Sequence, residues 1–489
     1  MTDTHIMQRP SRGQAARELL KLAFPLILSN LFWTLQLTID RVFLSQYSSD
    51  AVAACLGAVM LFYTPFILLQ TTVAIATTFV AQYYGAGRPE RIGAVINHAL
   101  YFCLVAGIAF LGLWPIAEPV MAWVGHSPQI QVLEVAYFQT LCFSALPMFI
   151  VAAVTAFFAG RGDSWTVLWY YAAGMVTNAV LDYLWIFGYG GFPEMGIAGA
   201  GWATVAGSYV SALVALALMW RPALRREYQL WASWRVERNL VGRLLWNGVP
   251  SGLQAAIDCS IWTGFALMLG WLGDAELAAS SIIFAINASF LVPMLGMGQA
   301  VSVTVGQRLG EDRPDLAEQS AWIGALMAAA FMVVVALLLA LAPELFLFLF
   351  ASRQNPEQWA AVARIVPTLL YFVAAYTFFD SMNIMITFAL RGAGDTRFVT
   401  VLTFVLGFVM MVMPTYYAST NGWGIYWCWG IAACYLMVQC AAFTARFLWG
   451  PWRSMRVIEQ TPLEEELMAD RPSVSRSPER EREALELSS

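Results

Sequence analysis

Long apolar segments recur along the whole chain, and short polar segments separate them. A transmembrane α-helix needs about 20 predominantly apolar residues to cross the hydrocarbon of a bilayer, and twelve segments approach that length. Their centres lie near residues 31, 66, 105, 145, 176, 208, 256, 293, 332, 373, 408 and 437. The pattern therefore predicts an all-α integral membrane protein with twelve transmembrane helices.

The composition supports this class. Of the 489 residues, 59% are hydrophobic and 12% are charged. A soluble domain carries about 25% charged residues, so half of the usual charge is missing. A polytopic membrane protein explains the deficit, because its lipid-facing and buried surfaces both exclude charge.

The basic residues are distributed unevenly between the expected loops. If the N-terminus is cytoplasmic and twelve helices alternate, all but three of the 27 Lys and Arg fall on the inner side. The exceptions are Arg41, Arg353 and Arg364. An excess of positive charge marks cytoplasmic loops. We therefore expect a multi-pass protein of the cell membrane, the inner or plasma membrane of a prokaryote, with both termini in the cytoplasm.

Two motifs occur twice. Gln-x-x-Gly-x-x-Arg-Pro lies at residues 82–89 and again at 307–314, and Gly-x-Gly-Asp-[Ser/Thr] lies at 160–164 and at 392–396. Glycine and proline here are typical of tight loops between helices. Both copies of each motif fall on the inner side, so the chain is predicted to contain two parallel six-helix repeats. Transporters are commonly built in this way, with the site at the interface between the repeats.

The duplication predicts five segments along the chain. They are a cytoplasmic N-terminus (1–17), an N-lobe (18–220), a cytoplasmic linker (221–240), a C-lobe (241–450) and a disordered cytoplasmic tail (451–489). The tail is rich in acidic residues, Ser and Pro and has no apolar periodicity, a composition that cannot bury a core.

Four acidic side chains lie inside the apolar segments: Asp40, Asp182, Asp258 and Asp380. A carboxylate at the centre of a bilayer costs roughly 2.5–3.5 kcal/mol, so such residues face a bundle interior or a water-filled cavity. Four of them indicate a protein that moves ions or charged solutes. The alternatives are an interfacial ion pair of Asp40 with Arg41, and hydrogen bonds between helices for Asp258 and Asp380.

Two of these acids have a polar partner one helical turn away. Asn178 precedes Asp182 by four residues, and Tyr376 precedes Asp380 by four, so each pair shares a helix face. Hard cations such as Na⁺ prefer several oxygen ligands, whereas a carboxyl group in low-dielectric surroundings retains a proton more readily than one in water. The sequence leaves Na⁺ and H⁺ open as the coupling ion.

Nucleotide hydrolysis is not expected to drive the protein. A Walker A loop requires Gly-Lys-[Ser/Thr], but the single lysine, Lys21, lies between Leu20 and Leu22. The sequence also lacks an HExxH motif and the clustered His or acid pairs of an integral-membrane enzyme. We therefore expect no enzymatic activity, no nucleic-acid partner and no cofactor beyond the coupling ion.

Several of these features occur together in one known family. Pro25 and Asp40 share the first helix, the Gly-x-Gly-Asp loops follow, and Asn178-x-x-x-Asp182 precedes a Gly- and Ala-rich segment at 196–204. In this combination the chain resembles the multidrug and toxic compound extrusion (MATE) transporters, in particular their NorM-like branch, over about residues 15–450. The resemblance implies a V-shaped arrangement of two lobes in a monomeric antiporter. It also implies export of cationic or amphiphilic organic compounds in exchange for Na⁺ or H⁺ by alternating access.

The resemblance also implies two sites. The N-lobe site for the coupling cation or proton would comprise Asp40, Asn178, Asp182 and Thr204. The C-lobe site, for a cation or for substrate, would comprise Asp258, Tyr376 and Asp380, and Na⁺ could bind at either set. Asp258 lies eight residues after Pro250, where the family often has Glu. Thr204 could instead bond to its own helix.

A lipid-linked oligosaccharide flippase of the same superfamily is the alternative function. Such a protein must hold an anionic pyrophosphate, which favours Arg or Lys within the spans. The charges expected to be buried here are all negative, so cationic cargo is favoured. Besides this cargo, the expected partner is membrane lipid.

Overall fold

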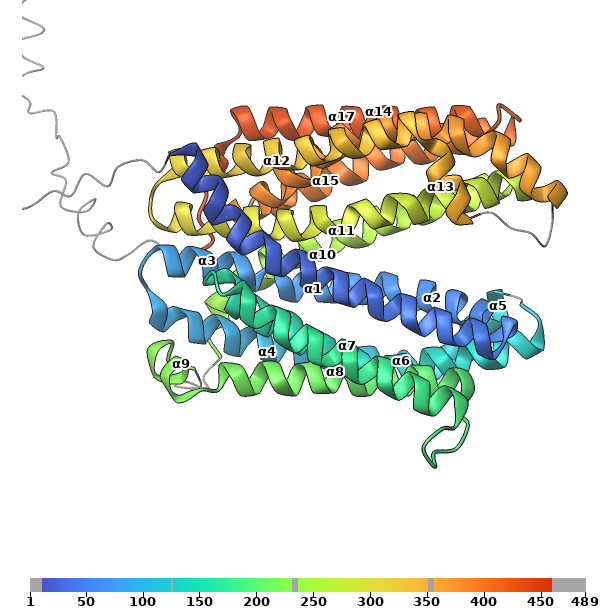
Figure 1. Ribbon diagram of the computed structural model, residues 1–489. Helices are drawn as coiled ribbons and strands as arrows, with labels where there is room; N and C mark the ends of the chain where they lie inside the picture. Colours follow the sequence, from blue (N-terminus) through green and yellow to red (C-terminus); the bar gives the residue numbers. More distant parts are fainter. Residues whose placement is uncertain (1–10, 125, 231–235, 351–355, 460–489) are drawn as a thin grey trace, which may run out of the picture. The chain divides into compact units, whose positions relative to one another are not determined.

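The computed structural model describes residues 11–459 except 125, 231–235 and 351–355, and these residues form helices and turns without any strand. Figure 1 shows long helices running side by side along the bundle. The first half of the chain contains α1 (Arg12–Tyr47), α2 (Ser49–Ala74), α3 (Ala76–Gly85), α4 (Pro89–Leu111), α5 (Ala117–Val124), α6 (Pro128–Gly160), α7 (Ser164–Phe187) and α8 (Gly196–Met219).

A short helix in the linker, α9 (Pro222–Glu227), precedes the second half. That half contains α10 (Arg238–Gly270), α11 (Asp274–Gly310), α12 (Pro314–Leu341), α13 (Pro343–Phe350), α14 (Pro356–Ala393), α15 (Thr396–Leu406), α16 (Met413–Thr420) and α17 (Ile425–Trp449). A π-helical turn at Gly407–Val412 joins α15 to α16. The all-α prediction is confirmed.

Within the described ranges, eleven helical stretches are long and apolar enough to cross a membrane. Some combine two elements, such as α2 with α3 and α15 with α16. The remaining long helix, α7, has 24 residues but is less apolar, because it carries Asn178, Asp182 and several Tyr and Trp side chains. Counted with α7, the bundle has the twelve helices predicted, and the protein is a multi-pass membrane protein.

The repeated motifs end and begin helices, as predicted. Pro89 and Pro314 occupy the first turns of α4 and α12. Gly162 and Gly394 have φ values of 91° and 95°, a left-handed conformation that only glycine adopts without strain. The side chain of Asp163 then caps α7 by accepting a hydrogen bond from the Thr166 amide.

We call the helices of the first half of the chain the N-lobe and those of the second half the C-lobe. In the N-lobe α7 packs on α8 and α1, and α6 packs on α8 and α2; in the C-lobe α14 packs on α11, α12 and α17. The lobes meet where α1 and α3 contact α11 and where α2 contacts α10. Figure 1 shows α1 crossing α11 in the part of the bundle nearer the start of α1.

The two ends of the bundle differ in charge. We call the end at which α1 begins the basic end, because Arg41 and Arg364 are the only described Lys or Arg near the opposite end. The basic end also carries α9, the α3–α4 and α11–α12 turns and both Gly-x-Gly-Asp loops. The asymmetry predicted from the sequence is thus present along the bundle.

The C-terminal tail begins later than predicted. Residues 451–454 form a helical turn, and the side chains of Trp452 and Val457 are buried. The Val457 amide donates a hydrogen bond to Gln82 Oε1 at 2.9 Å. The predicted boundary at 451 is therefore wrong by several residues, because an aromatic and an apolar side chain anchor this segment. The rest of the predicted tail, residues 460–489, lies outside the described residues.

Candidate cation and substrate sites

Three helices of the N-lobe bring the predicted coupling residues together. Asp40 comes from α1, Asn178 and Asp182 from α7, and Thr204 from α8, and none is more than 4% exposed. Thr204 Oγ1 donates to Asp40 Oδ2 at 3.3 Å and accepts from Asn178 Nδ2 at 3.4 Å. The carboxyl groups of Asp40 and Asp182 are close enough to interact electrostatically.

Several oxygen atoms in this cluster have no hydrogen-bond partner. They are Asp40 Oδ1, Asn178 Oδ1 and both carboxyl oxygens of Asp182. Two adjacent buried carboxylates cannot both ionise unless a cation compensates them, and the neighbouring Arg41 is exposed. The arrangement therefore suits one bound proton, or one small cation held by carboxylate and amide oxygens.

The N-lobe acids alone do not form a metal site. In the described part of the chain, no group of three or more His, Cys, Asp or Glu side chains has a geometry that could hold a metal ion. Na⁺ in the N-lobe would depend on the amide of Asn178 and the hydroxyl of Thr204 in addition to the two acids. The Thr204 hydroxyl donates to the Asp40 carboxylate, and the Asn178 amide donates to that hydroxyl.

The bridging position of Thr204 leads to a measurable expectation. Thr204→Val removes a hydroxyl that both donates to Asp40 and accepts from Asn178. A lost hydrogen bond costs about 1 kcal/mol, so the KM for the coupling ion should rise roughly fivefold, while Thr204→Ser should stay near wild type. Initial rates of transport against ion concentration measure this. Equal KM values for the Val and Ser variants would contradict a role for the hydroxyl.

Two further residues lie next to this cluster but were not predicted from the sequence. Tyr137 of α6 and Cys55 of α2 are buried and close enough to interact with each other. Tyr137 is also close to Asp40 and Asp182. Neither residue shares a helix with the acids, so no spacing in the sequence connects them to the site.

A further buried acid lies one turn from Tyr137. Glu134 is 0% exposed, its Oε1 lies 2.8 Å from His126 Nδ1, and its Oε2 has no partner. Glu134 also packs so tightly on α2 that a Cβ atom at Gly57 would lie 2.0 Å from Oε1. Glu134 was not among the predicted site residues, because it lies near the start of its helix, where a charge is expected to be solvated.

The C-lobe residues also converge. Asp258 of α10 lies close to Asp380 of α14, and Tyr376 lies one turn before Asp380. Both acids are partly buried, whereas Tyr376 is 1% exposed and its hydroxyl group has no partner. Gln254 Nε2 donates to Asp258 Oδ2 at 2.7 Å. The C-lobe site is thus more accessible than the N-lobe cluster.

One expectation about this lobe is wrong. The charges inside the helices are not all negative, because the partly buried Arg391 lies within α14 beside Asp258. Its guanidinium donates to Gln254 Oε1, and its Nε atom is buried without a partner. The sequence placed Arg391 in an inner loop, whereas α14 continues to Ala393 and keeps the side chain inside the lobe.

The duplicated glutamines link the lobes reciprocally. Gln82 Nε2 of the N-lobe donates to the carbonyl of Gly392 at 3.1 Å, and Gln307 Nε2 of the C-lobe donates to the carbonyl of Gly160 at 2.9 Å. Each glutamine of one repeat therefore bonds to the Gly-x-Gly-Asp loop of the other. We call these two bonds the glutamine latch. It lies at the basic end, and it gives the repeated motifs a role beyond ending helices.

Side chains of α1 and α11 form further contacts between the lobes. Asn30 Nδ2 donates to Gln299 Oε1 at 3.3 Å, and Arg308 pairs with Glu18 at 3.2 Å. A Cβ atom at Gly310 would lie 2.1 Å from the carbonyl oxygen of Gln82, so the helices approach as closely as glycine permits. The structure is therefore closed between the lobes at the basic end.

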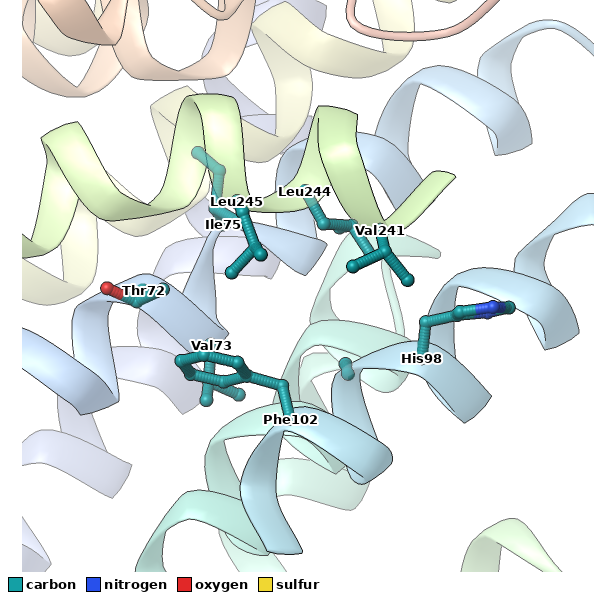
Figure 2. A pocket seen from close by; sticks show the side chains of 9 residues that line it. Thr72, Val73, Ile75, His98, Phe102, Val241, Leu244 and Leu245 are labelled. Carbon is teal, nitrogen blue, oxygen red and sulfur yellow. The ribbon is translucent and has the colours of Figure 1, made fainter. Parts of the chain in front are cut away.

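A small cavity lies at the lobe interface, away from the acids. Figure 2 shows Thr72 and Val73 of α2, His98 and Phe102 of α4 and Leu245 of α10 around it. Its volume is about 40 Å³, far below the ~300–1,000 Å³ of drug-sized ligand sites. We regard it as a packing gap rather than a cargo site.

The comparisons with known proteins match this architecture. A family model described as MatE matches residues 25–184 and 250–417, one match in each lobe. The chain belongs to the MatE family. The resemblance found in the sequence is confirmed, and the two matched segments correspond to the two predicted repeats. As a MatE member the chain is a membrane transporter and not an enzyme.

Among the most similar curated proteins is the multidrug resistance protein PmpM of Pseudomonas aeruginosa, 30% identical over 80% of this chain and 82% of its own length. A probable multidrug resistance protein NorM of Bradyrhizobium diazoefficiens is 27% identical over 81% of this chain and 85% of its own. These relatives place the MatE chain near the NorM-named members of the family.

Solved structures share the fold of this MatE protein at low identity. A MOP superfamily transporter from Pyrococcus furiosus aligns with a TM-score of 0.81 and 20% identity, covering 90% of this chain and 96% of that one. A multidrug resistance MATE transporter solved in an outward-facing conformation aligns with a TM-score of 0.80 and 21% identity, covering 92% and 98%.

Proposed function

We propose that this protein is a secondary antiporter that exports cationic or amphiphilic organic compounds, such as drugs and toxins, in exchange for Na⁺ or H⁺. The names of the curated relatives support the substrate class, since they are multidrug resistance proteins. Export against a gradient needs an energy source, and the sequence offers no nucleotide-binding motif. An ion gradient then supplies the energy.

The N-lobe cluster is the observation that carries this proposal. Asp40 and Asp182 are adjacent and buried, and three of their four carboxyl oxygens have no partner. A buried acid pair is costly unless it binds a cation. Binding and release of one proton or Na⁺ at this pair in each cycle would couple the ion gradient to transport.

The C-lobe site suits the cargo or a second cation. Asp258, Asp380 and Arg391 together carry one net negative charge when all are ionised. Arg391 lies beside Asp258, so the carboxylate offsets the positive charge that a pyrophosphate would require. A cationic amphiphile compensates that charge, and the same balance disfavours the flippase alternative.

We propose alternating access as the transport mechanism, and the contacts between the lobes support it. We place the basic end in the cytoplasm, because positive charge marks cytoplasmic loops, and both termini lie there in consequence. The glutamine latch would then close the inner side in this state, so the coupling ion would enter from outside. Release of the latch would let the lobes rock apart and expose the sites inward. A single chain contains both lobes, which supports a monomer as the working unit.

Proteoliposomes loaded with a fluorescent cationic dye test this function. Na⁺ and H⁺ gradients are imposed separately, and efflux is compared with that from liposomes without protein. We expect efflux under at least one gradient; dependence on Na⁺ would give weight to Asp258, Tyr376 and Asp380, and dependence on H⁺ to Asp40 and Asp182. No efflux under either gradient would refute the proposal.

A further inference from the structure

Arg391 connects the latch at the basic end to the acidic site of the C-lobe. Its backbone carbonyl accepts a hydrogen bond from Thr78 Oγ1 at 3.1 Å, and the next carbonyl, that of Gly392, accepts from Gln82 Nε2. Both donors belong to α3 of the N-lobe. The position of this backbone segment therefore depends on whether the lobes are closed at the basic end.

The side chain of Arg391 forms its contacts within the C-lobe. The guanidinium of Arg391 donates to Gln254 Oε1, and Gln254 Nε2 donates to Asp258 Oδ2 at 2.7 Å. An unbroken series of hydrogen bonds and covalent bonds thus runs from Thr78 and Gln82 to Asp258. Asp380 lies beside Asp258 at the end of this series.

The arrangement of Arg391, Gln254 and Asp258 differs from the ion pairs that usually stabilise a fold. Arginine and carboxylate groups that stabilise a fold usually form a direct bidentate pair, but here Gln254 stands between Arg391 and Asp258. The Nε atom of Arg391 is buried without a partner. The guanidinium therefore acts on the acidic site mainly through its charge, while the carboxyl groups remain available to a ligand.

We propose that Arg391 is a positioning residue that lowers the affinity of the C-lobe site for cationic cargo while the basic end is closed. Closure holds residues 391–392 against α3 and keeps the guanidinium beside Asp258, where it competes electrostatically with the cargo. Opening of the latch frees this segment, and the competition weakens. An exporter needs such a difference, because it must bind cargo tightly when it faces inward and release it when it faces outward.

This inference rests on the proposed function, and binding and transport measured on the same variants test it. Arg391→Gln should lower the Kd for a cationic dye about tenfold in detergent-purified protein and lower the kcat of dye efflux about tenfold, since release becomes slow. Arg391→Lys, which keeps the charge, should lie between wild type and Arg391→Gln. The matched control is Arg397→Gln, which removes an exposed arginine near the same loop and should leave both values unchanged.

The route through Gln254 is tested separately. Gln254→Leu leaves Arg391 charged but removes the hydrogen bond that holds the guanidinium beside Asp258. The electrostatic competition should then weaken, and dye binding should tighten. Asp258→Asn in the Arg391→Gln background should abolish the gain in affinity, because the acid that the arginine restrains is gone. Non-additive effects in this double-mutant cycle are the signature of direct coupling.

The outcomes separate the two ideas. Wild-type protein that moves no dye under any gradient would overturn the proposed function itself. Normal wild-type efflux, combined with an unchanged dye Kd in Arg391→Gln and Gln254→Leu, would overturn the role of Arg391 alone. If Arg391→Gln is not recovered as folded protein, Gln254→Leu and Arg391→Lys decide the question, and wild-type affinity in both would refute the proposal.

Discussion

Asp182→Asn is expected to abolish ion-coupled export and leave a folded, membrane-inserted protein. Asparagine has nearly the same shape as aspartate but cannot bind a proton or contribute a negative charge to a cation. Both carboxyl oxygens of Asp182 lack hydrogen-bond partners and the residue is 0% exposed. Removing the charge therefore relieves a desolvation cost rather than breaking a contact, so stability should not fall.

Gradient-driven dye efflux measures this loss, and it should drop to the rate of empty liposomes. Thermal unfolding of the same preparation checks the fold, and its midpoint should equal or exceed that of wild type. Asp50→Asn is the matched control, because Asp50 is an exposed acid on α2 of the same lobe. Unchanged export by Asp182→Asn would remove Asp182 from the coupling mechanism.

Asp40 provides the complementary test of the pair. Asp40→Asn should also uncouple export, because the two carboxyl groups share one site. The double variant should then be no worse than either single variant, since residues that act as a unit are strongly non-additive. Additive losses would indicate two independent ion sites rather than one.

Gly310→Ala is expected to hinder closure of the lobes at the basic end. A Cβ atom there would lie 2.1 Å from the carbonyl oxygen of Gln82, which belongs to the backbone and cannot rotate away. Overpacking of this kind costs about 1–3 kcal/mol. Since the clash exists only when the lobes are closed, it should lower the ratio of closed to open molecules roughly 5- to 150-fold, the range that this free energy corresponds to.

Spin labels at the basic ends of α4 and α12 report this ratio through their distance distribution, and dye efflux should fall with it. The repeat predicts the same result for Gly85→Ala, where a Cβ atom would lie 2.0 Å from the carbonyl oxygen of Gln307. Gly264→Ala on α10 is the control, because no atom lies within 4 Å of its Cβ position. A distance distribution in Gly310→Ala identical to wild type would contradict the idea that the close approach at Gly310 is needed for the lobes to close at the basic end.

The sequence by itself determined the features that depend on local pattern. Apolar length predicted the membrane helices, because bilayer thickness constrains each span separately. The duplicated motifs predicted two six-helix lobes, and the four-residue spacing of Asn178 with Asp182 and of Tyr376 with Asp380 predicted shared helix faces. Each of these relations is contained within one helix or one loop, so no tertiary information was needed.

The tertiary structure decided which of these faces meet. Thr204, Tyr137 and Asp40 join Asp182 from three other helices, and only the packing of α1, α6 and α8 around α7 brings them together. The family resemblance had named Asp40 and Thr204, and the spacing along the helices gave Asp40 and Asp182 a similar height, but only the packing brings all three residues together. Tyr137 had no signal in the sequence at all.

The same limit applies to Arg391 and to the glutamine latch. The sequence showed an arginine near a helix end and two glutamines in a repeat, and each was compatible with an ordinary loop. The latch exists because the two lobes dock with each repeat facing the loop of the other. Arg391 is partly buried because α14 continues past it. Burial of a polar side chain at a helix end is set by the packing of neighbouring helices, and only the folded molecule determines it.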